Sequence, residues 1–555
     1  MAVDYNLVIL GDGPVARYAA EYARSLNARV ALVTGFSPKV SNAYPIGVYT
    51  DHMTIQALRH IAQALPTYIH GPHQVGPLLL PDLPSSQPYD LAKLHWSHLL
   101  SLIQTLITGQ FEGRSLSALE QLGVDVVYAD DCDEAVSSEP PPSSAEFCMD
   151  AAVGLQTSRR RLLSQAYLIA VDGEAVVPAI PGIEDVSYTT LDTFLIPSVE
   201  SQPPTSVLIL SNNSQGVEAA YSLGAVGISV TLVMELEYCV EDNNAHQWVN
   251  SSLEAIGVKI HWDTSVVRLE QRDRQCVASL KSNDSAANNT EVIADCLLLV
   301  LGRQVDFTAL QLGTVGVTYD AKGVKVNSHY QSNNAQIFAC GDAVDSPPDL
   351  NQRYAQVAIA VHHALFDRSV WSNSWLSNLL LRGLKQWLRP SLPPSPPLLP
   401  SMVSISPPLA FIGYSEAEAR HRYGASVPDG RSERLTILYE SYQILDQAQL
   451  LGAHYPHSMA GWCKLLVLDD GQIVGAYVWG MQAEEVIGAI ALAMRQSIPL
   501  DDLGQLCLSL PSIVAELLQR LGVQWEQERV KRRSLLFDGL ELAFNWQRDW
   551  TGSKK

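Results

Sequence analysis

Gly11, Gly13 and Ala16 form a G-x-G-x-x-A pattern directly after a short apolar run. In such a pattern the first glycine permits a tight turn, the second lets the backbone approach a pyrophosphate, and the third small residue packs a helix against a strand. The backbone amides of this turn, which includes Pro14 and Val15, would then point at the phosphates of a dinucleotide. The same pattern also occurs in strand–helix units that bind no ligand, so other segments must decide between the two.

A second segment repeats the pattern incompletely. Aligned on the helix GVEAAYSLGAVG, its glycine positions hold Ser211, Asn213 and Gly216, so the third glycine alone is present. Asparagine tolerates positive φ better than most residues, but any Cβ at the second position crowds the place where a pyrophosphate would lie. Binding of a nicotinamide nucleotide here stays open, with Gly216 and Arg303, in the turn after the apolar run CLLLV, as candidate residues.

A third segment, IFACGDAV, places Gly341 and Asp342 at the end of another short strand. An aspartate at such a position can accept a hydrogen bond from a polyol hydroxyl, while the following helix directs its amino end at phosphate. The alternative is an ordinary helix cap. Thr34 ends the second strand of the first unit, where an acidic residue commonly binds the adenosine ribose, and its hydroxyl can accept one hydrogen bond.

The elements around these residues predict two strand–helix–strand units of the Rossmann type. In the first unit, an apolar run at 5–10 precedes an alanine-rich helix at 15–26 and a strand at 28–34. In the second unit, strands at 205–210 and 228–235 flank the helix. The sequence therefore predicts an α/β protein with parallel sheets, and its 555 residues suffice for about three or four domains.

Composition and net charge indicate which partners the protein can bind and in which cellular compartment it is located. The formal net charge of -21, from 37 basic and 58 acidic residues, would repel nucleic-acid backbones and anionic lipid. The 8 cysteines form no Cys-x-x-Cys pairs, and the sequence enters a strand pattern at once, which predicts a cytoplasmic, reducing location. No apolar run approaches the ~20 residues of a membrane span. The histidines show no metal-ligand spacing, so no metal site is expected.

Together these segments resemble the class I pyridine nucleotide-disulfide oxidoreductases, the family of glutathione reductase, dihydrolipoamide dehydrogenase and mercuric reductase. AYLIAVDGEAVVPAIPGI resembles the link that closes the first flavin segment, and FIGYSEAEARHRYG resembles the lead-in to the dimerisation domain. The resemblance implies two Rossmann-like domains of FAD and NAD(P) type, an α+β C-terminal dimerisation domain, a homodimer, and FAD and NAD(P)H as cofactors. The implied organisation is an FAD-binding domain whose first segment is 1–201, an NAD(P)-binding-like domain at 202–325, a second FAD-binding segment at 326–366, a Trp- and Pro-rich insertion at 367–405, the dimerisation domain at 406–520 and a C-terminal extension at 521–555.

The sequence departs from that family at its redox and acid-base groups. No cysteine precedes Cys132, and an alignment of SNAYPIGVYTDHM places Tyr44 and Tyr49 near the two positions of the family's redox dithiol. Tyrosine can stack beside a flavin but cannot form a disulfide or a thiolate–flavin pair. The family's His-Pro-Thr-x-x-Glu motif aligns with LPSIVA, which has Leu510 at the His position and Ala515 at the Glu position. Neither side chain can accept or donate a proton in acid-base catalysis. Disulfide reduction by the family mechanism is therefore excluded.

The resulting hypothesis is an FAD-dependent oxidoreductase that passes electrons through the flavin directly to a small-molecule or protein acceptor, with NAD(P)H as a candidate donor. Its catalytic residues are unknown. The expected cofactor-binding residues are Gly11, Gly13, Pro14, Val15, Ala16, Thr34, Tyr44, Tyr49, Gly216, Arg303, Gly341 and Asp342. The alternative is a catalytically retired dimeric scaffold, with or without flavin. It would dock a partner through the insertion, where 371–389 is expected to form an amphipathic helix that contacts a membrane surface, a partner or the protein's own core.

Overall fold

The described part of the chain falls into two compact units in the computed structural model. Unit 1 comprises 1–239 and 250–396, and unit 2 comprises 240–249 and 397–555. Within these ranges the structure describes residues 4–35, 105, 112–128, 148–150, 154–156, 161–194, 204–236, 240, 242–282, 290–345, 350–366, 399–424, 435–452, 460–505, 512–532, 542 and 544–546.

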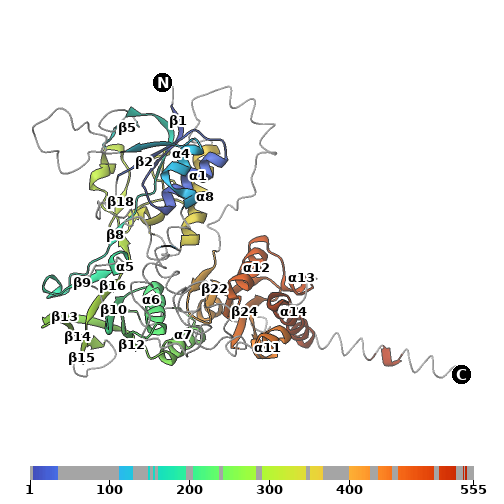
Figure 1. The fold of residues 1–555 in the computed structure, drawn as a ribbon. Helices are drawn as coiled ribbons and strands as arrows, with labels where there is room; N and C mark the ends of the chain where they lie inside the picture. The colour runs from blue at the N-terminus through green and yellow to red at the C-terminus, as the bar shows by residue number, and fades with distance from the viewer. Residues whose placement is uncertain are drawn as a thin grey trace, which may run out of the picture. The chain divides into compact units, whose positions relative to one another are not determined.

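The first sheet of unit 1 is parallel and has the strand order β20-β7-β1-β2-β3 (Figure 1). Its strands are β1 (Tyr5–Leu10), β2 (Val30–Thr34), β3 (Asp125–Tyr128), β7 (Ser164–Ile169) and β20 (Ile337–Ala339). Leu7 and Ile9 pack with the helices α1 (Pro14–Ser25) and α8 (Leu350–Phe366), whereas Val8 and Leu10 belong to the core on the opposite face. Both faces of the sheet are therefore buried, as is usual for parallel strands.

A second parallel sheet lies between β7 and β20 in the sequence, with the strand order β12-β11-β10-β16-β9. Its strands are β9 (Tyr188–Thr190), β10 (Ser206–Ser211), β11 (Ser229–Met234), β12 (Lys259–His261) and β16 (Cys296–Val300), and its helices are α6 (Ser214–Ala225) and α7 (Asn243–Ala255). The chain thus leaves the first sheet, builds the second, and returns to the first with β20. The predicted α/β class with two Rossmann-like sheets is confirmed.

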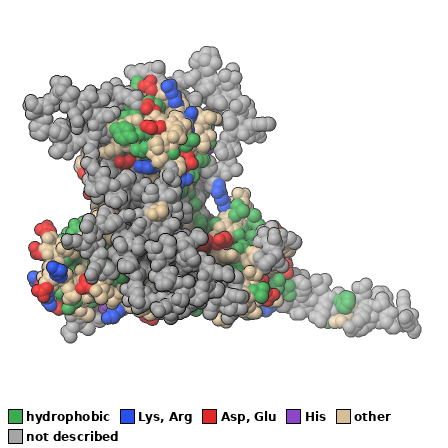
Figure 2. Space-filling model, in the orientation of Figure 1, with side chains coloured by type: hydrophobic (Ala, Val, Ile, Leu, Met, Phe, Trp, Pro, Cys, Tyr) green, Lys and Arg blue, Asp and Glu red, His purple; other side chains and the backbone are tan. Residues whose placement is uncertain are grey.

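A three-stranded antiparallel sheet, β13 (Thr264–Arg272), β14 (Gln275–Ser282) and β15 (Thr290–Ala294), accompanies the second parallel sheet. Exposed ion pairs join Arg272 to Glu270 and Glu291 on this sheet, where Figure 2 shows acidic and basic side chains interspersed. Such exposed pairs each contribute about 0–1 kcal/mol, so this is a solvated face.

The remaining elements of unit 1 are short. They are the strands β4 (Cys148–Asp150), β5 (Gly154–Gln156), β6 (Arg161–Leu162), β8 (Glu174–Ala175), β17 (Arg303–Gln304), β18 (Tyr319–Asp320) and β19 (Gly323–Val324), with the helices α4 (Leu116–Gln121) and α5 (Leu191–Phe194). The 3-10 turns are η4 (Glu112–Arg114), η5 (Ile183–Asp185), η6 (Thr308–Leu310), η7 (Leu312–Val315) and η8 (Gly341–Ala343). None of the described helices has the length and apolarity needed to span a membrane.

Unit 2 is built on an antiparallel sheet with the strand order β21-β22-β25-β24-β23. Its elements are β21 (Ser401–Val403), β22 (Leu409–Gly413), α10 (Glu416–Tyr423), β23 (Leu435–Ser441), η9 (Tyr442–Ile444), α11 (Asp446–Gly452), β24 (Gly461–Leu468), β25 (Ile473–Gly480), α12 (Ala483–Gln496), α13 (Leu500–Gly504) and α14 (Ile513–Arg532). One apolar core holds the sheet to α12, α13 and α14, and Trp525 of α14 is part of it. The α+β architecture predicted for this part of the chain is confirmed.

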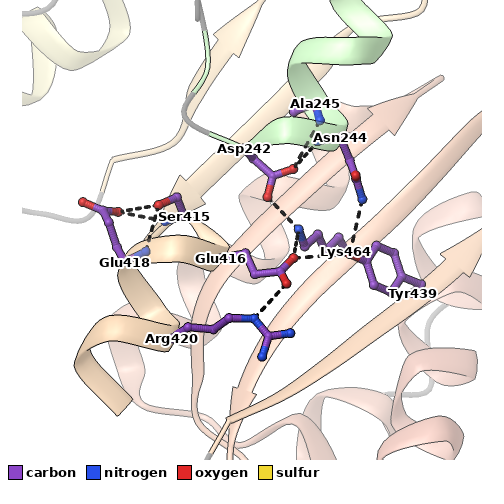
Figure 3. Close-up of polar contacts among 9 residues, drawn as sticks. All are labelled: Asp242, Asn244, Ala245, Ser415, Glu416, Glu418, Arg420, Tyr439 and Lys464. Carbon is purple, nitrogen blue, oxygen red and sulfur yellow. Dashed lines mark hydrogen bonds and ion pairs between the residues drawn. The ribbon is translucent and has the colours of Figure 1, made fainter. Parts of the chain in front are cut away.

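A buried ion cluster connects 240–249 to the sheet of unit 2 (Figure 3). The Nζ of Lys464, whose side chain is 2% exposed, lies 2.6 Å from Oδ2 of Asp242 and also pairs with Glu416. The other carboxylate oxygen of Asp242 accepts hydrogen bonds from the first amides of α7. Burial lowers the pKa of Lys464, but the hydrogen bonds to Asp242 and Glu416 outweigh burial, so its pKa is raised and the ammonium stays charged.

We expect Lys464→Met to lower the free energy of unfolding of unit 2 by about 3–5 kcal/mol, because it leaves the buried Asp242 carboxylate uncompensated. Urea unfolding followed by tryptophan fluorescence measures the change. Lys531→Met is the matched control, since Lys531 is exposed and pairs with Glu528 at the surface of α14. Equal effects of the two substitutions would show that the buried cluster contributes no more than a surface pair.

Candidate functional site

The turn between β1 and α1 has the geometry that the first motif predicts. Gly11 has φ +136°, and a Cβ built on it would overlap the carbonyl oxygen of Ala170, whose carbonyl carbon would lie 2.7 Å away. Gly13 is the N-cap residue of α1 and makes no side-chain hydrogen bond to the helix amides, and Pro14 is the first residue of the helix. The first amides of α1 are therefore not capped by a side chain, as an anion site requires.

The third segment lies directly against this turn. Gly341 has φ +68°, and a Cβ built on it would come within 3.1 Å of the Val15 side chain. Val15 and Ala16 are both buried beneath the turn. The structure thus brings together the predicted residues of the first and third motifs, although they are more than three hundred positions apart in the sequence.

Asp342, the aspartate of the third motif, is held on several sides. Its side chain is 2% exposed, Arg353 of α8 donates to its Oδ1 at 2.7 Å, and Arg303 lies 3.4 Å from its Oδ2. The backbone amide of Gly173 donates to the same Oδ2 at 3.0 Å. These contacts fix the carboxylate in place and neutralise its charge.

Asp172 is a residue of this site that the sequence reasoning missed. It follows β7 by three positions, and a Cβ built on Gly13 would overlap its carboxyl group. Its Oδ2 atom is buried and has no hydrogen-bond partner among the described residues. The available signal was its position just beyond a buried strand, at the same carboxyl edge of the sheet as the Gly11 turn.

The surroundings of Asp172 favour its neutral form. Burial raises its pKa most, the neighbouring carboxylates of Asp342 and Asp12 raise it further, and the cations of Arg303 and Arg353 offset part of this, giving a pKa of about 8. At pH 7 Asp172 is therefore mostly a protonated acid, able to donate a hydrogen bond.

At the end of β2, Thr34 is 3% exposed, and its hydroxyl oxygen is buried without a hydrogen-bond partner among the described residues. The adjacent amide of Gly35 donates to the carboxylate of Asp12 at 3.3 Å. A buried hydroxyl without a partner is costly, and a ligand hydroxyl would satisfy it. This suits the ribose contact predicted for Thr34.

The second turn, between β10 and α6, is closed by its own side chains. The side-chain oxygen of Asn213 accepts from the amide of Gln215 at 3.0 Å, so it caps α6 where a phosphate would otherwise bind. A Cβ on Gly216 would overlap the side chain of Ser211, which explains why this glycine is needed for packing. Arg303 does not face this turn: its guanidinium donates to both Asp192 oxygens, at 2.8 and 3.0 Å. Its predicted nucleotide contact stays a prediction.

Other predicted sites lie at the margins of the described structure. The described residues do not include Tyr44, Tyr49, Leu510 or the insertion helix predicted at 371–389. Ala515 is fully buried in α14, and the neighbouring Glu516 accepts from the amide of Asp446 at 2.9 Å at the start of α11. Among the described residues, no group of three or more His, Cys, Asp or Glu side chains could hold a metal ion.

The family model described as pyridine nucleotide-disulphide oxidoreductase matches residues 5–364, and the model of that family's dimerisation domain matches residues 399–520. Among curated proteins, the chain is 25% identical over 304 residues to dihydrolipoyl dehydrogenase of Bacillus subtilis, covering 54% of this chain and 57% of that protein. It is 22% identical over 515 residues to glutathione reductase of Nostoc sp., covering 89% and 94%.

Mercuric reductase of Staphylococcus aureus is 23% identical over 504 residues, covering 90% of this chain and 79% of that protein. Among solved structures, the HOCl-induced flavoprotein disulfide reductase RclA from Escherichia coli aligns with a TM-score of 0.66 at 18% identity, covering 94% of this chain and 99% of that one. These matches confirm the likeness inferred from the sequence. The matched dimerisation domain supports a homodimer.

Proteins of the matched family bind FAD and use NAD(P)H as electron donor. The described residues fit the adenosine and pyrophosphate half of FAD: a glycine turn that admits no Cβ, an uncapped helix start, and the buried hydroxyl of Thr34 without a partner. Among the described residues, the Asp172 carboxyl group lies against Gly13, where the motif would admit the phosphates, so it must turn aside when they bind.

We expect Gly11→Ala to abolish flavin retention, because the added Cβ overlaps the Ala170 carbonyl and places alanine at φ +136°, with about 1–3 kcal/mol of backbone strain. The ratio of visible flavin absorbance to protein in the purified chain measures retention. Gly113→Ala is the control, since a Cβ there meets no heavy atom within 4 Å. Flavin retained by the Gly11→Ala variant at the parental ratio would contradict the assignment of this turn.

Proposed function

Because the chain belongs to the pyridine nucleotide-disulphide oxidoreductase family, we propose that it is an FAD-dependent oxidoreductase that transfers electrons through the flavin directly to a small-molecule or protein acceptor. NAD(P)H is the electron donor of this family. The observation that carries the proposal is the combination of an intact phosphate turn at Gly11 with a first 131 residues that contain no cysteine.

The four cysteines whose side chains the structure describes do not offer a replacement dithiol. Cys276, Cys340 and Cys463 are buried, and Cys296 is half-buried. Burial raises the pKa of Cys276 and of Cys296 to about 11 and raises the pKa of the other two still further. Thiolates are the reactive form, so these cysteines are inert thiols at neutral pH.

The C-terminal end of the chain supports the same proposal. The side chain of Ala515 has no acidic or basic group. The neighbouring carboxylate of Glu516 accepts hydrogen bonds from the first amides of α11 and pairs with Arg520 at 3.0 Å, so it has a structural role. An acid-base pair serves to protonate a leaving thiolate, so its absence matches the absence of a dithiol.

The chain's own residues would hold FAD rather than react. The free amides at the start of α1 bind phosphate charge, Asp342 accepts a ribityl hydroxyl while Arg303 and Arg353 hold it in place, and Thr34 accepts from ribose. When bound, FAD supplies the redox chemistry by accepting a hydride and passing its electrons on. The scaffold alternative, with or without flavin, is not favoured, because the chain matches the models of an oxidoreductase family. A flavin-free scaffold would also need neither the uncapped helix start nor a buried Thr34 hydroxyl that lacks a partner among the described residues.

The test is an anaerobic titration of the purified, full-length chain with NADH and NADPH. We expect a yellow protein whose flavin absorbance bleaches with one of the two donors and returns on addition of a quinone. Prior alkylation with N-ethylmaleimide should leave the rate unchanged, because no thiolate takes part. A colourless protein, or a rate abolished by alkylation, would overturn the proposal.

A second prediction concerns the turn before α6. Asn213→Gly removes a Cβ and frees the amide of Gln215, so we expect the KM for the nicotinamide nucleotide to fall about fivefold, the equivalent of one hydrogen bond of about 1 kcal/mol. Loss of the asparagine cap itself costs only about a few tenths of a kcal/mol when glycine replaces it.

Steady-state kinetics with saturating acceptor measure the KM. Ser115→Gly is the control, since Ser115 caps another helix, α4, in the same way by accepting from the amide of Ala118 at 3.2 Å. An unchanged KM in the Asn213→Gly variant would mean that the donor binds without contact to this turn.

A further inference from the structure

The carboxyl group of Asp172 lies beside the amino end of α1, in the space that the bare backbone of Gly13 leaves open. A dinucleotide needs this same space, because the second glycine of the motif exists to let a pyrophosphate approach the backbone. Oδ2 of Asp172 is buried there without a hydrogen-bond partner among the described residues. A buried oxygen without a partner at an anion site indicates a group whose partner is the ligand.

Four charged groups of the described residues act on Asp172. The carboxylates are Asp12, from the turn after β1, and Asp342, from η8; the cations are Arg303 of β17 and Arg353 of α8; Cys340 precedes η8. Both arginines are already paired with Asp342, and Arg303 also with Asp192. Neither arginine is therefore left to neutralise Asp172 fully. If Asp172 ionises, its negative charge lies largely uncompensated beside the bound phosphate and repels it.

We propose that Asp172 is a proton-operated gate of the phosphate site at Gly13, which admits a dinucleotide when its carboxyl group is protonated and repels it when ionised. The protonated acid turns from Gly13 and donates its hydrogen to a phosphate oxygen, while the carboxylate can only accept. The one bond that forms is the O–H bond of the Asp172 carboxyl group: one proton is taken up from solvent when FAD binds to the ionised form. This inference rests on the proposed function, since it concerns the same FAD site.

The pH dependence follows from the sign of the shift. Because the pKa of Asp172 in the protein without FAD is about 8, the acid is protonated below pH 8 and affinity is constant there. Bound phosphate raises the pKa further, so above about pH 8 each pH unit weakens FAD binding about tenfold and binding takes up one proton.

The experiment is calorimetric titration of the full-length, FAD-depleted chain with FAD from pH 6 to pH 10, in buffers of different ionisation enthalpy. We expect the dissociation constant of the parent to be flat and then rise about tenfold per pH unit above about pH 8, with uptake of one proton. Asp172→Asn has nearly the same shape and retains a donor but cannot ionise, so its affinity should not change with pH. Asp320→Asn, at an exposed carboxylate of β18, is the control and should behave as the parent.

Each outcome decides a separate point. Identical pH profiles of parent and Asp172→Asn, or no proton uptake by the parent above pH 8, overturn the gate while leaving the proposed function intact. Absence of FAD binding by both proteins at every pH overturns the proposed function together with the gate. The proton uptake of the parent is measured without any variant, so a variant that fails to fold does not prevent the test.

Discussion

The close approach of Gly11 to the backbone of Ala170 is the contact on which the site depends. It joins the ends of β1 and β7, neighbouring strands of one parallel sheet, and a Cβ at position 11 would separate them. Because the carboxyl ends of parallel strands meet at one edge, this contact also aligns the start of α1 with the Gly341 turn after β20. The candidate cofactor site is therefore assembled by the sheet, from segments that lie far apart in the sequence.

Charge balance at this edge is the second constraint. The carboxylates of Asp172 and Asp342 are buried beside two guanidinium groups, and Asp342 pairs with both Arg303 and Arg353. Arg303 is shared with a further carboxylate, that of Asp192. Buried charges are stable when paired, and an extra carboxylate is accommodated most readily by holding a proton. The protonated state of Asp172 thus follows from its burial and from the neighbouring carboxylates of Asp342 and Asp12, which together outweigh the two arginines that hold Asp342. Binding chemistry and local stability use the same groups here.

The sequence predicted the parts of the site that depend on local backbone geometry. The glycine pattern, the Gly341–Asp342 pair and the two Rossmann-like sheets follow from strand periodicity and turn residues, which are local properties. Asp172, the partners of Arg303, and the buried Lys464 cluster were not predicted. They depend on which loops meet across the sheets, and a single sequence does not encode such contacts in any local pattern. The Asn213 cap was anticipated in part, because a Cβ at the second glycine position was recognised as an obstacle.

The proposed FAD site and the role of Asp172 both require that the amino end of α1, beside Gly13, holds the pyrophosphate of FAD. A crystal structure of the full-length chain grown with FAD below pH 7 measures this directly. The account predicts pyrophosphate bound to the first amides of α1, with the Asp172 side chain turned away from Gly13 and in contact with a phosphate oxygen. Density for the Asp172 carboxyl still against Gly13, with no dinucleotide at the turn, would contradict it.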